Sequence, residues 1–346
     1  VALFQGGGHA PAPVLPATPY NYAAPDLPAH FLTRLVRGLD NTPADNPITD
    51  HGATLGRVLF YDKKLSVDGT IACASCHKQE NAFTDPNRFS TGVLGRKGDR
   101  NSMALVNLRY YRNGRAFWDE RAKTLEEQAL GPVTNPIEMA MTDQAALEKV
   151  LRSIPGYAPL FKKAFPKDEQ PITAQNFAKA IGAFERTLVT PSKFDAYLAG
   201  DDKALSDAEK KGLETFINVG CIACHSGQGI GGGMFQRLGF AAPVKDLKDL
   251  GRFEVTKKEA DKFVFRVPSL RNIAKTAPYM HDGSKKTLDE MVVYMGKYQL
   301  GRDLKTDEVT SIVTFLNALT GELPKGTATA PKLPPNGKET PKPDPS

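Results

Sequence analysis

Long apolar runs, cysteines and clustered charge are all scarce in this 346-residue chain. No apolar stretch approaches the ~20 residues of a membrane-spanning helix, so we expect no membrane span. Four cysteines are too few for a disulfide scaffold. The formal net charge of +6 is spread along the chain, and the lack of a Lys/Arg block argues against a nucleic-acid partner. The sequence has no sustained alternation of apolar and polar residues, so it predicts no extended β-sheet.

All four cysteines lie in two C-x-x-C-H motifs, which leaves none for a free catalytic thiol. In such a motif two thiols form thioethers to a haem and the adjacent histidine binds the iron. A redox dithiol or half a zinc site would not need a histidine directly after each pair. We therefore expect two covalently attached haem c groups and a periplasmic or other extracytoplasmic, mature chain. The motifs are Cys73-Ala74-Ser75-Cys76-His77 and Cys221-Ile222-Ala223-Cys224-His225.

The fold is expected to be mainly α, because apolar residues recur at helical spacing between the two ends. A helix precedes each haem motif, and a later helix closes over it. The predicted helices are one around 55–60, one from Thr173 to Leu188, one from the capping box Ser206/Glu209 to Gly220, one after the capping box Thr287/Glu290, and one over 309–319 that ends before Gly321.

This pattern predicts two cytochrome c-like domains, each with one c-type haem, and extended Pro-rich ends. We expect a flexible arm over 1–28, a first haem domain over 29–190 and a second over 191–321. Residues 322–346 are expected to form a Pro-rich tail that is either solvated or packed on the first domain.

Further short stretches surround the two motifs in a specific order and resemble the bacterial di-haem cytochrome c peroxidase family, which includes the MauG-type enzymes. The resemblance covers roughly residues 45–322. The stretches are Leu59-Phe60-Tyr61-Asp62, Arg100-Asn101-Ser102, Phe117-Trp118-Asp119, Gly131-Pro132 with Asn135 and Glu138, Val267-Pro268-Ser269-Leu270-Arg271-Asn272, and Ala277-Pro278-Tyr279-Met280-His281-Asp282-Gly283.

The resemblance implies different roles for the two haems. The haem on His77 would be the site at which hydrogen peroxide is reduced to water, and the haem on His225 would receive electrons from a small cytochrome c or cupredoxin. A periplasmic homodimer is implied as well.

Met295 matches the family's second iron ligand opposite His225. A thioether ligand raises haem potential, and Met295 lies on the apolar face of its predicted helix. Met280 and then His281 are the alternatives, and simple core packing is the other role open to Met295. MauG-type enzymes use a tyrosine here, but Tyr294 would point about 100° away from Met295 around the helix.

The resemblance also implies catalytic residues around the first haem. Glu138 would move a proton between the two peroxide oxygens, and Gln128 and Phe117 would line the same pocket. Trp118, the only tryptophan, would lie between the haems as an electron bridge and an anchor of the domain interface.

A calcium ion between the haems is implied by the resemblance alone. Asn101 would offer its side-chain oxygen, while Thr276 and Pro278 would offer backbone carbonyls.

One departure from the family concerns the loop from Thr84 to Gly95. Many relatives carry a histidine there that blocks the peroxide-binding iron until the second haem is reduced, and this loop has none. We therefore expect an open first haem that needs no reductive activation. His9, His30 and His51 are expected to be surface or local polar residues rather than replacement ligands.

Three functions compete at this point. The first is peroxide reduction, and the second is a MauG-like oxidation of a protein substrate by stored oxidising equivalents. The missing histidine favours the second, whereas Met295 disfavours it. The third is simple electron transfer, which Glu138, Gln128 and the absent blocking ligand argue against.

Overall fold

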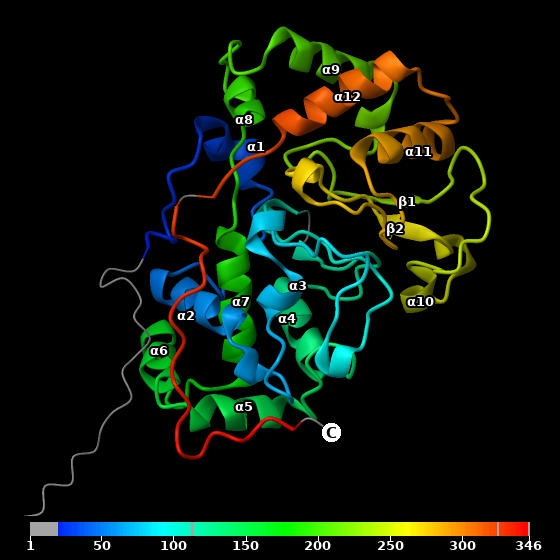
Figure 1. The fold of residues 1–346 in the computed structure, drawn as a ribbon. Helices are drawn as coiled ribbons and strands as arrows, with labels where there is room; N and C mark the ends of the chain where they lie inside the picture. The colour runs from blue at the N-terminus through cyan, green and yellow to red at the C-terminus, as the bar shows by residue number, and fades with distance from the viewer. Residues whose placement is uncertain (1–19, 112–113, 324, 345–346) are drawn as a thin grey trace, which may run out of the picture.

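The computed structural model describes residues 20–111, 114–323 and 325–344, and these residues are predominantly helical (Figure 1). The helices are α1 (Arg34–Arg37), α2 (Asp50–Tyr61), α3 (Cys73–Cys76), α4 (Leu125–Thr134), α5 (Gln144–Ser153), α6 (Tyr157–Ala164), α7 (Ala174–Thr187), α8 (Lys193–Leu198), α9 (Asp207–Asn218), α10 (Phe253–Thr256), α11 (Leu288–Leu300) and α12 (Thr306–Ala318). The strands β1 (Phe235–Arg237) and β2 (Val264–Arg266) pair antiparallel, with Phe235 opposite Arg266.

Two large hydrophobic cores divide the described chain. The first is built from residues between 55 and 188 together with Ala328, and the second from residues between 194 and 319. A small third cluster joins Phe31, Val36, Tyr110 and Val189. In Figure 1 the elements of the first core form the lower body and those of the second form the upper body. The exact boundaries of the two domains stay a prediction.

Three of the predicted helices, α7, α9 and α11, begin where the sequence predicts them. The side chain of Thr173 caps α7, and capping boxes begin α9 and α11. After α9 the chain reaches Gly220 at a φ of +105°, a left-handed conformation that glycine adopts without steric cost. This turn places the second haem motif directly after its helix.

Each core contains one close helix pair, α2 with α7 and α9 with α12. A Cβ added to Gly56 on α2 would lie 1.9 Å from the carbonyl oxygen of Ala180 on α7. A Cβ added to Gly212 on α9 would lie 2.2 Å from the carbonyl oxygen of Ser311 on α12. The two cores therefore have the same kind of contact, a glycine at the point where the helix before the motif meets the later helix.

Both ends of the described chain pack on the body. Tyr22 is 4% exposed and its hydroxyl donates to the carbonyl of Thr327 at 2.5 Å. The segment 325–344, red in Figure 1, runs beside α2 and ends near the loop around Val67, whose carbonyl accepts from the Asp344 amide at 2.9 Å. His9 lies outside the described residues, as does most of the predicted N-terminal arm.

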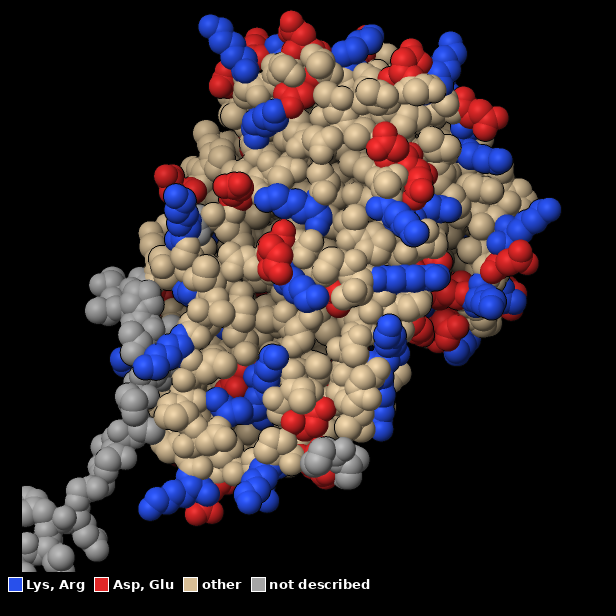
Figure 2. Space-filling view, viewed as in Figure 1, with Lys and Arg blue, Asp and Glu red and all other residues tan. Residues whose placement is uncertain are grey.

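Positive and negative side chains alternate over the face shown in Figure 2, without a large area of one sign. Within the described residues no helix is long and apolar enough to cross a bilayer.

Candidate functional site

Two cavities mark the two C-x-x-C-H motifs. The first, of about 1030 Å³, is lined by Cys76 and His77 and by residues of the loops that surround them. The second is narrower, about 210 Å³, and its lining includes Cys221, Cys224 and His225. The two cavities share a wall, because Asn101, Trp118 and His281 line both.

His77 is oriented so that one ring nitrogen remains for a metal. Its Nδ1 lies 2.8 Å from the carbonyl oxygen of Phe83 and 3.3 Å from the hydroxyl of Ser102. A proton on Nδ1 donated to the Phe83 carbonyl leaves Nε2 as the unprotonated ligand atom. Burial also lowers the pKa of His77, which favours the neutral ring that iron requires.

The cysteines do not have the properties of a redox dithiol. All four are unpaired, and a reactive thiol needs a depressed pKa. Burial instead raises the pKa of Cys76 and that of Cys221 to about 11. Two unreactive thiols in one motif, followed by a neutral histidine, fit a covalently attached haem c at each motif.

Glu138 lies in the first cavity, as expected from the resemblance. The turn after α4 positions it: the Glu138 amide donates to the Asn135 carbonyl at 3.0 Å, and the Asn135 side-chain amide donates to Glu138 Oε1 at 2.8 Å. Burial raises the pKa of Glu138, while Arg121 and the Asn135 hydrogen bond act in the opposite direction. A carboxyl group with these properties exchanges protons more readily near neutral pH than an exposed one.

Gln128 and Phe117 line the same cavity. Gln128 projects from α4, and Phe117 sits in a turn with a φ of +73°. This left-handed conformation is unfavourable for a residue with a side chain and is often found where a site fixes a side-chain direction.

Trp118 lies between the two cavities. Its indole Nε1 donates to the Asn101 carbonyl at 2.9 Å, and its own carbonyl accepts from the Arg266 amide at 2.8 Å. Because Arg266 belongs to the second half of the chain, Trp118 joins the two halves as well as the two cavities.

The loop that lacks the family's histidine packs directly on the Glu138 turn. The Val93 amide donates to the Glu138 carbonyl at 3.0 Å. A Cβ added to Gly92 would lie 1.9 Å from the Ile137 carbonyl oxygen, so only glycine fits there. Apart from His77, the only histidine that lines this cavity among the described residues is His281.

Neither His30 nor His51 reaches the first cavity. His51 is an exposed residue of α2. His30 is buried, and its Nε2 lies 2.9 Å from a carboxylate oxygen of Asp195. It thus has a local polar role.

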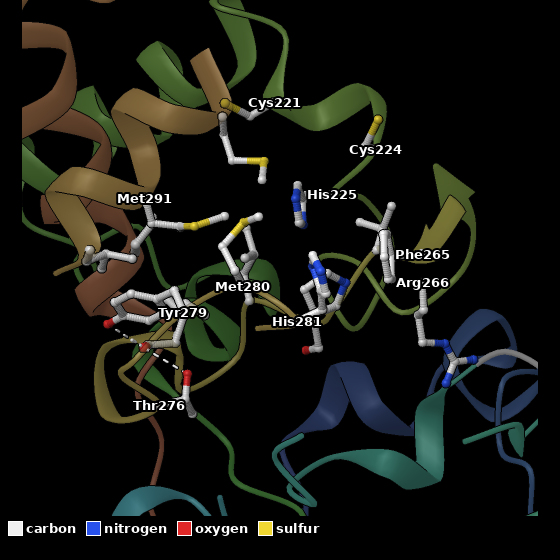
Figure 3. A pocket seen from close by; sticks show the side chains of 18 of the residues that line it. Cys221, Cys224, His225, Phe265, Arg266, Thr276, Tyr279, Met280, His281 and Met291 are labelled. Atoms are coloured by element: carbon white, nitrogen blue, oxygen red, sulfur yellow. Dashed lines mark hydrogen bonds between the residues drawn. The ribbon is translucent and has the colours of Figure 1, made fainter. Parts of the chain in front are cut away.

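Three methionines line the second cavity with His225: Met280, Met291 and Met295. Met291 and Met295 are four residues apart on α11, and therefore face the same side. Figure 3 shows Met291 and Met280 reaching toward His225. Met280 was the expected rival of Met295; Met291 is a further sulfur that sequence reasoning missed, although its place on the apolar face was visible.

Tyr294 does not line either cavity among the described residues. Its ring lies 4.5 Å from that of Tyr298, and the ammonium of Lys285 is 4.7 Å from its centre.

His281 stacks on Phe265 at 4.1 Å between ring centres. Burial lowers the pKa of His225 to about 4, which favours the neutral imidazole.

The three residues expected to bind calcium, Asn101, Thr276 and Pro278, all line the second cavity. The Asn101 side-chain NH₂ donates to the carbonyls of Asn87 and Arg88, both at 3.2 Å. This orientation leaves the Asn101 amide oxygen as an acceptor, which suits a cation that prefers oxygen ligands.

Sequence reasoning missed two further groups at the first cavity. The Phe83 carbonyl that orients His77 is a backbone atom, so no side-chain pattern could reveal it. Arg121 lines the cavity beside Glu138; its only sequence signal is its position two residues after the Phe117-Trp118-Asp119 stretch.

Comparisons with known proteins agree with this geometry. The family model for di-haem cytochrome c peroxidase matches residues 50–203. The cytochrome c551 peroxidase of Pseudomonas aeruginosa is 44% identical over 302 residues, 86% of each chain. That of Nitrosomonas europaea is 45% identical over 295 residues, 85% of this chain and 86% of its own.

A crystal structure of a MauG-like protein associated with microbial copper homeostasis matches with a TM-score of 0.76 and 32% identity, and the match covers 84% of this chain and 96% of that one. The family model covers the first C-x-x-C-H motif, while the curated relatives and the solved structure match more than four fifths of the chain. The chain belongs to the di-haem cytochrome c peroxidase family.

Proposed function

We propose that this protein is a cytochrome c peroxidase that reduces hydrogen peroxide to two waters with two electrons and two protons. The observation that carries the proposal is the contrast between the two cavities. His77 shares its cavity with a half-buried carboxyl group and an amide, Glu138 and Gln128, whereas His225 shares its cavity with methionine sulfurs.

Haem c, attached through the thioethers of each motif, would supply iron for peroxide binding and one-electron chemistry. His77, through Nε2, and His225 would bind the iron of the two groups. Glu138 accepts a proton from one peroxide oxygen and returns it to the other, and Gln128 orients the substrate by hydrogen bonding. Electrons enter on the His225 side, and Trp118 occupies the shared wall that they must cross.

Steady-state oxidation of a reduced small cytochrome c or cupredoxin by hydrogen peroxide tests this function. We expect saturable turnover that consumes two donor molecules per peroxide. A haem-loaded protein that exchanges electrons with the donor but does not consume peroxide would instead be an electron carrier. We also propose that the reaction takes place in the periplasm and that the protein acts as a homodimer.

The first haem is proposed to be open in the oxidised protein, because the loop Thr84–Gly95 supplies no histidine. Among the described residues His281 is the only histidine besides His77 that lines the first cavity, and its ring is stacked on Phe265. An EPR spectrum of the oxidised protein should show one high-spin and one low-spin iron. Two low-spin, six-coordinate irons would contradict this and would imply reductive activation.

Met295 is proposed as the second iron ligand of the haem at His225. Two other methionines, Met280 and Met291, line the same cavity and are the alternatives. Met295→Ala should change the low-spin spectrum and lower the potential of the second haem. Met291→Ala and Met280→Ala are the matched controls, because both sulfurs line the same cavity. If one of these changes the spectrum and Met295→Ala does not, that residue is the ligand.

Calcium bound by Asn101, Thr276 and Pro278 is also proposed. Removal with a chelator should lower turnover, addition of Ca²⁺ should restore it, and Asn101→Ala should abolish this response. No metal-binding cluster of His, Cys, Asp or Glu occurs among the described residues, so neutral oxygens would be the main protein ligands.

A MauG-like oxidation of a protein substrate is the second candidate, since the predicted open first site favours it. The cavity at His225 argues against it, because methionines line that cavity and, among the described residues, Tyr294 does not. A long-lived oxidised state formed by peroxide without any donor would support this second function.

A further inference from the structure

The first cavity contains a cation that none of the expected roles uses. Arg121 lines the cavity together with Glu138, Gln128 and Phe117. Its guanidinium carbon lies 3.5 Å from the centre of the Phe117 ring. A guanidinium that lies over an aromatic ring can still donate hydrogen bonds through its N–H groups.

A buried carboxylate holds Arg121 in this place. Asp119 is 4% exposed, and its two oxygens lie 3.2 and 3.3 Å from Arg121 Nη1. The same carboxylate also accepts from Arg100 Nη1 at 2.5 Å. Arg100 also donates to both oxygens of Asp249, at 2.7 and 2.8 Å. Arg100 is thus paired with two carboxylates, whereas Asp119 is the only carboxylate paired with Arg121 among the described residues.

The side-chain hydrogen bonds of Arg121 within the described residues involve Nη1 alone. The N–H groups of Nε and Nη2 are thus available to a ligand or to water. An arginine stays protonated under all ordinary conditions, so this positive charge is permanent.

Arg121 acts on Glu138 through space. It lowers the pKa of Glu138, against the larger effect of burial, and Asp99 raises it. Asn135 is the hydrogen-bond partner of the carboxylate, and the nearby Cys73 and Cys76 carry no charge once bonded to haem. Among the described residues, Arg121 is thus the cation that lowers the pKa of Glu138.

We propose that Arg121 is a further catalytic residue of the first cavity, which binds the anion formed when Glu138 takes a proton from hydrogen peroxide. In this step an O–H bond of H₂O₂ breaks, the proton forms a bond with the Glu138 carboxylate, and HOO⁻ remains. No electron is transferred. The inference rests on the proposed peroxide reduction, but the anion site that it describes can be measured without turnover.

The test titrates the haem-loaded, full-length protein with fluoride and azide, and follows first-haem absorbance. Both the oxidised and the half-reduced protein are titrated, so that an affinity is obtained in whichever form exposes the first iron. Arg121→Gln should weaken binding of both anions about tenfold or more, as expected for loss of a charged hydrogen bond. Arg121→Lys should recover part of this loss, because it restores the charge without the planar donor group.

Two controls separate anion binding from a general change of the cavity. Arg115→Gln removes a similar charge from the same segment, since the side chains of Arg115 and Arg121 are 41% and 44% exposed, and Arg115 pairs with Glu120. It should leave both anion affinities unchanged. Imidazole, a neutral ligand, should bind Arg121→Gln as tightly as it binds the original protein.

Equal anion affinities in Arg121→Gln and the original protein would overturn the proposal. So would an equal loss for imidazole and the anions, which would show that Arg121 supports the cavity and not the ligand. If peroxide is not turned over but the anion affinities fall as expected, the peroxidase function fails and the anion site stands.

Discussion

At the scale of residues, burial shifts the pKa values of side chains around the first cavity away from their ordinary values. Glu138 is a carboxyl group whose burial disfavours its charged form, and His77 is an imidazole that burial keeps neutral. Both pKa shifts suit the proposed site, which would bind iron through the His77 nitrogen and move a proton through the Glu138 oxygens. Substitution of Glu138 and of an exposed acid in the same cavity tests this at the level of single residues.

Glu138→Gln should lower peroxide turnover by roughly 10²–10⁴-fold, the usual effect of losing a general base. Both haem spectra should be retained. Because the carboxylate is the active form, turnover in the original protein should rise with pH through a pKa above the ordinary 4.5, and the Glu138→Gln variant should lack this rise. Glu254→Gln, an exposed acid that lines the same cavity, is the control. Full activity in Glu138→Gln would remove this residue from the reaction.

Glu185 on α7 is a second unusual acid, with an effect on stability. It is 3% exposed, its Oε2 has no hydrogen-bond partner in the described structure, and burial raises its pKa to about 8. The unfolded chain titrates near ~4.3. Between these values the native state holds the extra proton, so the free energy of unfolding must fall as pH rises, by at most ~1.4 kcal/mol per pH unit.

Glu185→Gln should remove that part of the pH dependence. Urea unfolding at pH 5 and at pH 8 measures it: the original protein should lose stability relative to Glu185→Gln at pH 8. Glu214→Gln, whose carboxylate is 57% exposed, should behave as the original protein does. A pH dependence that is the same with and without Glu185 would contradict a proton held at this side chain.

At the scale of elements, the two large hydrophobic cores contain equivalent helix contacts. The pairs α2/α7 and α9/α12 each meet at a glycine, and in both cases the nearest atom to an added Cβ is a backbone oxygen of the partner helix. A backbone oxygen cannot rotate away as a side chain can. The contact therefore fixes the position of the helix that leads into each haem motif.

Gly56→Ala and Gly212→Ala should each lower the free energy of unfolding by about 1–3 kcal/mol or more, because overpacking forces the helices apart. Chemical denaturation followed at the absorbance of each haem should locate the two effects in different domains. Gly131→Ala in α4 is the matched control, since the nearest atom to its Cβ is 3.9 Å away on Phe117. Stability unaffected by Gly56→Ala would show that α2 and α7 can separate without cost.

At the scale of the whole molecule, polar contacts join the two halves around the shared wall of the cavities. Arg100 donates to both oxygens of Asp249 at 2.7 and 2.8 Å, and Arg88 donates to the Asp282 carbonyl at 2.8 Å. On the other side the C-terminal segment returns to α2. Arg57 donates to the carbonyl and the hydroxyl of Thr329 at 2.6 and 2.9 Å.

Deletion of residues 322–346 should destabilise the first domain by about 2–5 kcal/mol. The loss would leave the guanidinium of Arg57, which is 5% exposed, without its Thr329 acceptors, and would remove Ala328 from the first core. Urea unfolding followed at the first haem measures it. Deletion of 342–346 alone, which removes the backbone hydrogen bond to Val67, should cost under half as much. Equal stability of both shortened chains would show that the segment is held too weakly to matter.

The sequence by itself determined the chemistry that is local along the chain. Each C-x-x-C-H motif is a single turn, and helices such as α7, α9 and α11 begin at caps within a few residues of their first apolar positions. The ordered short stretches also predicted the family, and the resemblance to that family implied Glu138 and Met295 as site residues.

Only the tertiary structure decided which distant groups meet. The Phe83 carbonyl that orients His77, the three methionines around His225, and the stack of Arg121 on Phe117 all depend on how loops cross one another. The physical reason is that side-chain type and spacing fix local hydrogen bonds and helical faces, whereas a cavity is formed by segments whose approach is set by packing of the whole chain.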